Sequence, residues 1–306
     1  MVEKSCYVCG GSQHHEILRQ DCDDHYLNLV NPKLNQEYRA IVVCESCGFV
    51  FHSPTLTDDE IAVMYERFRD TDFRNETPDH YFDRITTLPK SESLNYQKVQ
   101  KLNLLIAKYG PARQHRTIYD VGIGGGVFVK TFLDYAEGKW EAYGVEPTRS
   151  YAELAARRLG ILVKSQFYEP RLFDLRFDFI TAIKVIEHAR DPIAFLKGLR
   201  QDLEDDGIVY VEVPNMKEIF SLPPDHDQLQ YTHLYFYSDR VFEHFCRMAS
   251  FQIVWMEQTL NRESDWDLNL ILKKDLTGPD YACRMPLYDY RDILKMRSSS
   301  APFRER

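Results

Sequence analysis

The sequence lacks the features that would place the protein in a membrane or on a nucleic acid. No apolar run in its 306 residues approaches the roughly 18 residues of a membrane-spanning helix, and Met1–Cys9 has no apolar core of a secretion signal. Basic residues are outnumbered, 38 Lys and Arg against 47 Asp and Glu, and the net charge of -9 would repel a polyanion. We therefore expect a cytoplasmic protein with a small-molecule substrate, no membrane partner and no nucleic-acid partner.

Cysteine is present in an odd number, seven, which does not suit a framework built only of disulfides. Four of the seven form two pairs with CxxC spacing, Cys6 with Cys9 and Cys44 with Cys47, and each pair is followed by a glycine. In a reducing compartment this pattern favours metal. Four thiolates would fill a tetrahedral Zn²⁺ site and leave no position for water, so the zinc is expected to be structural. Cys22 could replace one ligand, but it lacks a CxxC partner.

The distribution of cysteine, polar and apolar residues along the sequence divides the chain into four segments. Residues 1–54 form the cysteine-bearing unit, 55–110 a helical connector or lid, 111–274 an alternating strand and helix region, and 275–306 a polar tail. The form Thr57-x-x-Glu60 predicts a capped helix start. The polar stretch Arg67–Lys90 predicts an irregular connector.

The alternating region predicts a parallel sheet with helices on both faces, an α/β fold. Ligands of such sheets bind at the carboxyl ends of the strands. The expected strands are 117–121, 141–145, 161–164, 177–183, 208–213, 252–259 and 268–273, and the expected helices are 91–109, 127–135, 150–159, 192–203 and 239–248.

A glycine-rich turn follows the first of these strands. Asp120 precedes Gly122, Gly124, Gly125 and Gly126, and glycines let a backbone approach a ligand closely. A dinucleotide fingerprint would need Gly or Ala at Val127, and a phosphate-binding Walker loop would need Gly-Lys. An acidic residue beside the turn suits a cationic ligand better than a pyrophosphate. Glu146 ends the second strand, where a carboxylate can accept hydrogen bonds from two ribose hydroxyls.

These motifs, together with Phe177–His188 (FDFITAIKVIEH), resemble those of class I S-adenosylmethionine-dependent methyltransferases. The resemblance implies a Rossmann-like seven-stranded methyltransferase sheet over residues 111–274, with S-adenosylmethionine as cofactor. It places Asp120 and Gly122 near the methionine part, Glu146 at the ribose and Gln166 near the adenine. Gly124, Gly126 and Lys184 are further cofactor-binding candidates. The four-cysteine head is similar to the zinc-binding N-terminus of sugar C-methyltransferases.

The segment Val185-Ile-Glu187-His188, followed by Asp191-Pro192, resembles the V-L-E-H signature of the branch with ubiquinone-biosynthesis O-methyltransferases and sugar C-methyltransferases. His188 is the candidate base, since an imidazole can accept a proton from an attacking hydroxyl, amine or carbon. Glu187 and His188 could instead brace the next helix. Glu187 and His233 are further catalytic candidates, and Tyr81 is a candidate for a lid contact.

Together these features predict methyl transfer to a small-molecule acceptor in glycan or secondary-metabolite biosynthesis. Two alternatives stay open. One is an RNA methyltransferase with a zinc head, which would need a basic face. The other is a cofactor-binding interaction module without catalysis. The sequence makes no prediction of the oligomeric state.

Overall fold

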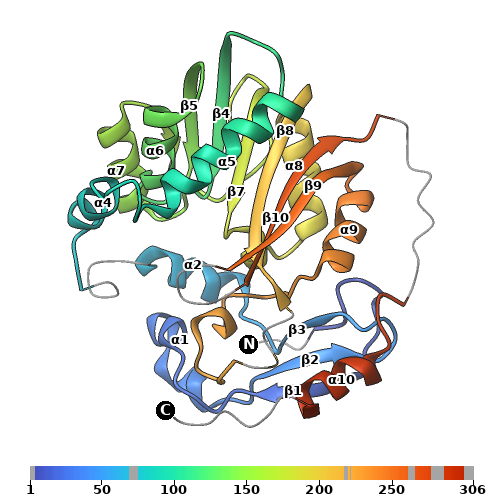
Figure 1. The fold of residues 1–306 in the computed structure, drawn as a ribbon. Helices are drawn as coiled ribbons and strands as arrows, with labels where there is room; N and C mark the ends of the chain where they lie inside the picture. Colours follow the sequence, from blue (N-terminus) through green and yellow to red (C-terminus); the bar gives the residue numbers. More distant parts are fainter. Residues whose placement is uncertain are drawn as a thin grey trace.

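The computed structural model describes residues 4–68, 75–216, 220, 222–260, 266–276 and 286–299. Its main feature is a seven-stranded sheet with the order β6-β5-β4-β7-β8-β10-β9 (Figure 1). The first five of these strands are mutually parallel, and β10 pairs antiparallel with both β8 and β9. The strands are β4 (His115–Val121), β5 (Lys139–Val145), β6 (Leu162–Lys164), β7 (Phe177–Ile183), β8 (Leu203–Pro214), β9 (Phe251–Leu260) and β10 (Trp266–Lys274).

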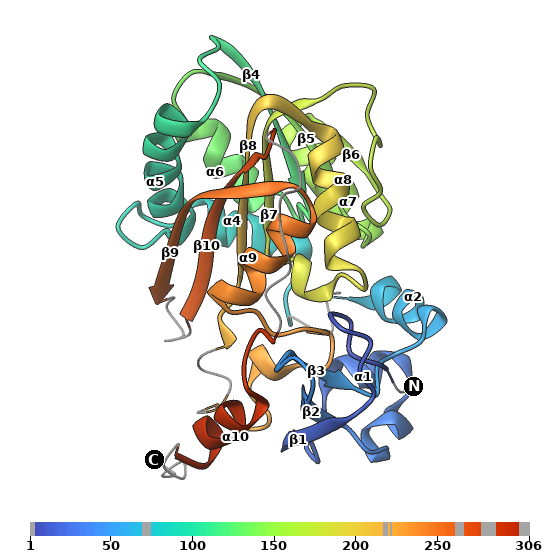
Figure 2. The ribbon, with the colours of Figure 1, turned by 90° about the vertical axis from the view of Figure 1, so that its right-hand side faces the viewer.

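Helices cover both faces of this sheet, and each face has its own apolar core (Figure 2). On one face pack α5 (Leu94–Tyr109), α6 (Val127–Tyr135) and α7 (Arg149–Leu159), and on the other α8 (Pro192–Asp202) and α9 (Asp239–Met248). Nearly every residue of β7 is buried, as expected for a central parallel strand covered on both faces. The predicted α/β, Rossmann-like methyltransferase fold is confirmed.

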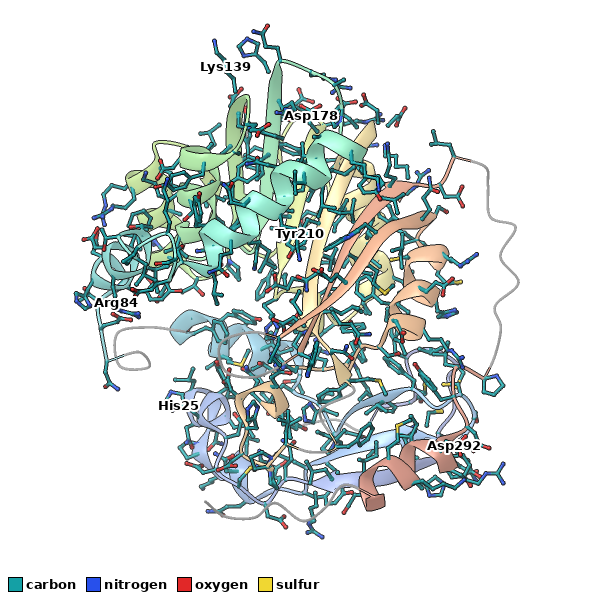
Figure 3. The ribbon with its side chains drawn as sticks, viewed as in Figure 1. His25, Arg84, Lys139, Asp178, Tyr210 and Asp292 are labelled. Atoms are coloured by element: carbon teal, nitrogen blue, oxygen red, sulfur yellow. The ribbon has the colours of Figure 1, made fainter. Side chains whose placement is uncertain are left out.

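The carboxyl ends of the parallel strands point toward a second, smaller sheet. Lys139 and Asp178, near the start of β5 and β7, lie at the far edge of the large sheet, and Tyr210 lies near its centre (Figure 3). The small sheet has three antiparallel strands, β1 (His14–Arg19), β2 (Ala40–Cys44) and β3 (Val50–Ser53). The helix α1 (His25–Val30) and the 3-10 turn η1 (Pro32–Gln36) connect β1 to β2.

The C-terminal segment returns to this small sheet. Helix α10 (Tyr290–Ser299) lies beside β1 and β2 in Figure 1, and its Ile293 is fully buried with Ile41 and Val43 of β2. The sequence indicated only a polar tail here. An ordered helix forms because the small sheet supplies the apolar surface that a polar 10-residue helix needs in water.

The two sheets share one core. Phe49 packs against Tyr235 and against Phe245 of α9, with ring centroids 5.6 and 5.8 Å apart. The loop before α9 also adds backbone hydrogen bonds to β3, from His52 N to the oxygen of Leu234 and from Phe236 N to the oxygen of Val50. The cysteine-bearing unit is therefore fused to the large domain rather than tethered to it.

Two helices lie near the edge where the parallel strands end (Figure 1). Helix α2 (Asp58–Arg67) begins with the predicted capping box between Thr57 and Glu60. Helix α4 (Pro78–Thr86) corrects the expectation of an irregular connector over 67–90, of which residues 69–74 lie outside the described residues. Its start has the usual signals, a Thr77 cap and a proline in the first turn. Within the described residues no helix has the length and apolarity needed to cross a membrane.

Candidate active site and metal centre

The glycine turn and Glu146 form one hydrogen-bonded unit. The two carboxylate oxygens of Glu146 accept hydrogen bonds from Gly124 N at 3.0 Å and from Thr148 N at 2.9 Å. Gly122, Gly124 and Gly126 all have positive φ, which an L side chain rarely adopts. A Cβ on Gly124 would meet no atom within 4 Å, so this stretch of backbone is open to a ligand. Gly126 instead packs against Leu159 of α7 and caps α6.

Asp120 lies beneath this turn rather than at its surface. Its side chain is 3% exposed and accepts a hydrogen bond from the Thr181 hydroxyl at 2.5 Å. Burial raises the pKa of Asp120 to about 7, against the opposing effect of that hydrogen bond. Asp120 would therefore not contact a ligand directly, and it would influence binding by supporting the backbone of the glycine turn.

A cavity of about 650 Å³ opens at the carboxyl ends of the strands. Its lining includes Gly122, Gly124 and Glu146 from the turns after β4 and β5, and Lys184 and His188 from the segment after β7. This volume is in the range of cofactor and substrate pockets. The cavity therefore has room for a ligand on the glycine turn with a second molecule beside His188.

Aromatic side chains form the wall that faces His188. The wall consists of Tyr65 and Phe68 from the end of α2, Tyr81 from α4, and Phe167 from the loop after β6. The Phe68 and His188 ring centroids lie 6.4 Å apart, and those of Tyr65 and Phe167 lie 5.1 Å apart. The prediction for Tyr81 matches its position at the cavity. Tyr65 and Phe68 were missed as site residues because their helical spacing is equally typical of a core.

Ion pairs hold α4 against α7 beside the cavity. Asp79 pairs with Arg157 at 2.7 Å and with Arg158 at 3.3 Å, and Asp83 also pairs with Arg158. Single surface pairs contribute about 0 to 1 kcal/mol, so the network rather than any one pair fixes this helix.

Glu187, His188 and His233 come together beside the cavity, whose lining includes His188. Glu187 and His188 lie in the 3-10 turn η2 (Ile186–His188) after β7, and His233 lies in the loop before α9. Their ligating atoms all lie within 4.8 Å of one another. Burial raises the pKa of Glu187 to about 8 and holds the pKa of His233 well below its usual value.

Two predicted cofactor-binding residues have different surroundings. Lys184 lines the cavity with a positive φ of 56° and forms an ion pair with Asp267 of β10. Gln166 is exposed and is not among the residues that line the cavity, whereas its neighbour Phe167 is. No signal in the sequence distinguished these neighbours, because the loop after β6 has no periodic pattern.

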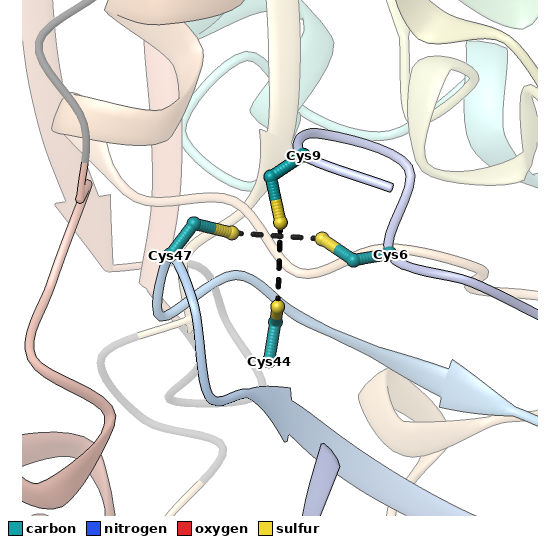
Figure 4. A group of neighbouring side chains, drawn as sticks. All are labelled: Cys6, Cys9, Cys44 and Cys47. Carbon is teal, nitrogen blue, oxygen red and sulfur yellow. Dashed lines mark hydrogen bonds between the residues drawn. The ribbon is translucent and has the colours of Figure 1, made fainter. Parts of the chain in front are cut away.

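The four predicted zinc ligands converge at one point (Figure 4). Cys6 lies 3.5 Å from Cys47, and Cys9 lies 3.5 Å from Cys44, measured between sulfur atoms. Tetrahedral zinc with bonds of about 2.3 Å requires sulfur atoms about 3.8 Å apart, so the arrangement fits this ion. A hydrogen bond from Cys47 lowers the pKa of Cys6 to about 5. Cys22 is not part of this group.

The cysteine knuckles are packed on both sides. A Cβ on Gly48 would lie 2.4 Å from the backbone oxygen of Tyr288, and Tyr288 N donates to the oxygen of Cys47 at 3.1 Å. On the other side, the Tyr7 hydroxyl donates to Asp191, a residue that lines the cavity and caps α8. The cysteine group is thus connected to the cavity through Tyr7.

Comparison with known proteins gives distant relatives over part of the chain. The tRNA U34 carboxymethyltransferase of Campylobacter lari is 28% identical over 138 residues, which cover 42% of this chain and 46% of the relative. That of Dichelobacter nodosus is 33% identical over 102 residues, 32% of each chain. A crystal structure of an S-adenosylmethionine-dependent methyltransferase from Clostridium acetobutylicum shares 10% identity and a TM-score of 0.46, covering 64% of this chain and 97% of that one. The match to the Campylobacter lari relative thus spans less than half of that relative's length.

A family comparison covers more of the chain. Residues 93–255 match the family described as a methyltransferase domain, from the cap of α5 to the middle of β9. This range contains the glycine turn, Glu146 and the Glu187-His188-His233 group. Because the match covers more than half of the 306 residues, the protein belongs to this methyltransferase family.

Proposed function

We propose that the chain transfers the methyl group of S-adenosylmethionine to a small-molecule acceptor. The observation that carries the proposal is that the glycine turn, Glu146 and His188 all line the same cavity. The cofactor, when bound, supplies a methyl group on a cationic sulfur. The chain's task is to hold that methyl group and the acceptor in line and to accept the acceptor's proton.

Glu146 is the proposed ribose partner. Each of its oxygens accepts one backbone hydrogen bond and, with two lone pairs, can accept another from a hydroxyl. The backbone bonds fix the carboxylate before the ligand arrives, which lowers the entropic cost of binding. Gly122 and Gly124 would then lie against the methionine part.

His188 is the proposed proton acceptor. Its Nδ1 lies 3.0 Å from the carbonyl oxygen of Thr232, which can only accept, so Nδ1 carries a hydrogen. The lone pair then lies on Nε2, as proton acceptance requires. The hydrogen bond from His188 to Thr232 also braces the loop, and this is compatible with proton acceptance because it fixes the orientation of the imidazole ring.

The cavity composition supports a small and uncharged or aromatic acceptor, such as a precursor in glycan or secondary-metabolite synthesis. Its described lining contains two long cationic side chains, and both have carboxylate partners, Lys184 with Asp267 and Arg190 with Asp58. Neither is positioned to bind a phosphate without losing that partner. The facing wall of aromatic rings can stack on a planar or sugar ring.

A tRNA acceptor is the second candidate, because the similar curated proteins are tRNA U34 carboxymethyltransferases. Incubation with methyl-labelled S-adenosylmethionine, in parallel with a metabolite extract and with total tRNA, separates the two. We expect label in the metabolite fraction. Label in tRNA would replace this proposal, and label in neither fraction, with cofactor binding intact, would favour a non-catalytic module.

We also propose that Cys6, Cys9, Cys44 and Cys47 bind one structural Zn²⁺. Support comes from four soft ligands at distances that suit the ion, three of them buried. Such a unit is too short to rely on its own apolar burial, and metal binding would supply folding energy.

A further inference from the structure

A second group of metal-ligating side chains lies outside the cysteine cluster. Glu187, His188 and His233 offer one carboxylate and two imidazoles whose ligating atoms lie within 4.8 Å of one another. Small side-chain rotations would bring them to the roughly 3.3 Å spacing of ligands around a metal with bonds of about 2.0 Å. His188 lines the cavity, so the group borders the space proposed for the acceptor.

The carboxylate of Glu187 is buried with only partial compensation, from the charge of nearby Lys184 and from its own backbone N–H. The residue is 1% exposed, and neither oxygen has a hydrogen-bond partner among the other residues that the structure describes. The neighbouring cation, Lys184, forms its ion pair with Asp267 instead. A buried acidic group without a donor from another residue is costly, and a cation held by its oxygens would remove that cost.

The two histidines are oriented as metal ligands usually are. Nδ1 of His188 faces the oxygen of Thr232 at 3.0 Å, and Nδ1 of His233 faces the oxygen of Gln228 at 2.9 Å. Carbonyl oxygens only accept, so each ring carries its hydrogen on Nδ1 and its lone pair on Nε2. A hydrogen bond from the far ring nitrogen to a backbone carbonyl is the common support of a metal-binding histidine.

The backbone holds the three residues in place. Leu234 N donates to the oxygen of Glu187 at 2.9 Å, which ties the His233 loop to the η2 turn. The ring of His52, on β3, lies 2.6 Å from the oxygen of His233. The ligands therefore come from two parts of the chain, the η2 turn and the loop before α9, and β3 supports the second of these.

We propose that Glu187, His188 and His233 form a binding site for a divalent transition-metal ion beside the cavity. One carboxylate and two imidazoles suit Mn²⁺, Fe²⁺, Co²⁺ or Zn²⁺, and three protein ligands leave positions open toward the cavity. Its chemical role rests on the proposed function: a bound ion would polarise the acceptor oxygen and make its proton easier to lose. In the metal-bound protein the Nε2 lone pair of His188 would bind the ion, and the proton-acceptor role proposed above would apply to the metal-free protein. Binding of the ion itself does not depend on that function.

Mn²⁺ is a suitable probe, because a hard ion binds the four-thiolate site poorly. The full-length protein with its zinc retained is titrated with Mn²⁺, and free Mn²⁺ is followed by its electron paramagnetic resonance signal. We expect one Mn²⁺ per chain, with affinity reduced more than about 100-fold in both Glu187→Gln and His233→Gln. Glu212→Gln, which alters a nearby buried carboxylate that pairs with Lys98, is the matched control and should retain binding.

Two further measurements keep the test decisive. Anomalous scattering from Mn²⁺-soaked crystals of the unaltered protein should give a peak between the three side chains, which covers the case in which a variant fails to fold. Unchanged Mn²⁺ affinity in both folded variants, or no peak at this group, would overturn the proposal. S-adenosylhomocysteine affinity, measured on the same samples, reports separately on the proposed methyl transfer.

Discussion

Replacement of Glu146 by alanine tests the proposed cofactor site. The substitution removes the acceptor of two backbone hydrogen bonds, from Gly124 and Thr148, at a residue that is 8% exposed. Hydrogen bonds to a charged group contribute about 1.5 to 3 kcal/mol each, and water at the cavity rim would replace part of them. We expect the unfolding free energy to fall by about 3 kcal/mol, measured by urea denaturation without ligand.

The same change should weaken cofactor binding separately. Loss of the ribose acceptor is expected to cost about 1.5 to 3 kcal/mol, which raises the Kd for S-adenosylhomocysteine about 10- to 150-fold. Isothermal titration calorimetry measures this directly. Glu146→Gln keeps one carbonyl oxygen and should give intermediate losses of stability and affinity.

Glu141→Ala is the matched control, because Glu141 is exposed on the same strand, β5, and away from the cavity lining. It should leave both quantities unchanged. A folded Glu146→Ala protein with unaltered affinity for S-adenosylhomocysteine would refute the reasoning and place the ribose elsewhere.

Three further predictions concern the metal, the reaction and pH. Elemental analysis should find one zinc per chain at the cysteines. Cys44→Ser should lower the melting temperature of the whole chain, because the core around Phe49 continues into α9. A metal-free preparation with an unaltered melting temperature would contradict this prediction. His188→Gln should lower turnover about 10²- to 10⁴-fold and keep S-adenosylhomocysteine affinity, and equal losses of affinity and stability would assign the residue to bracing alone. Burial raises the pKa of Asp120 to about 7, so its contribution to stability is present below about pH 4 and lost as pH rises through 7. Urea denaturation should therefore show Asp120→Asn gaining roughly 2 to 4 kcal/mol relative to the parent between about pH 4 and pH 8, and a constant difference would exclude a raised pKa.

Elements with strong local signals were predicted closely. The bounds of α6, β7 and α9 agree with the sequence, because each combines a periodic or continuous apolar pattern with clear end signals. Helices α4 and α10 were missed because their stability depends on distant partners. Asp79 of α4 relies on Arg157, and Ile293 of α10 relies on β2.

In the candidate site too, residues with a local sequence signal were predicted and those that depend on distant contacts were not. The sequence identified Glu146 and the histidines, whose positions after strands follow from the fold. Of the aromatic wall it identified Tyr81 alone, because contacts such as that of Phe68 with His188 join residues 120 positions apart. It also did not indicate that Glu187 would be buried without a donor from another residue, which depends on how the loop before α9 folds back over it.

The return of α10 to the small sheet has a consequence for folding during synthesis. The cysteine knuckles and β1–β3 leave the ribosome first, but Ile293, which covers them, follows Val50 by about 240 residues. At roughly 5 to 20 residues per second, this interval lasts about 12 to 50 seconds. Throughout it the thiols are accessible to metal ions in the cell. Once α10 docks, Tyr288 packs against Gly48 and leaves Cys9 as the exposed member of the four cysteines, so the proposed metal would bind more readily before this step than after it.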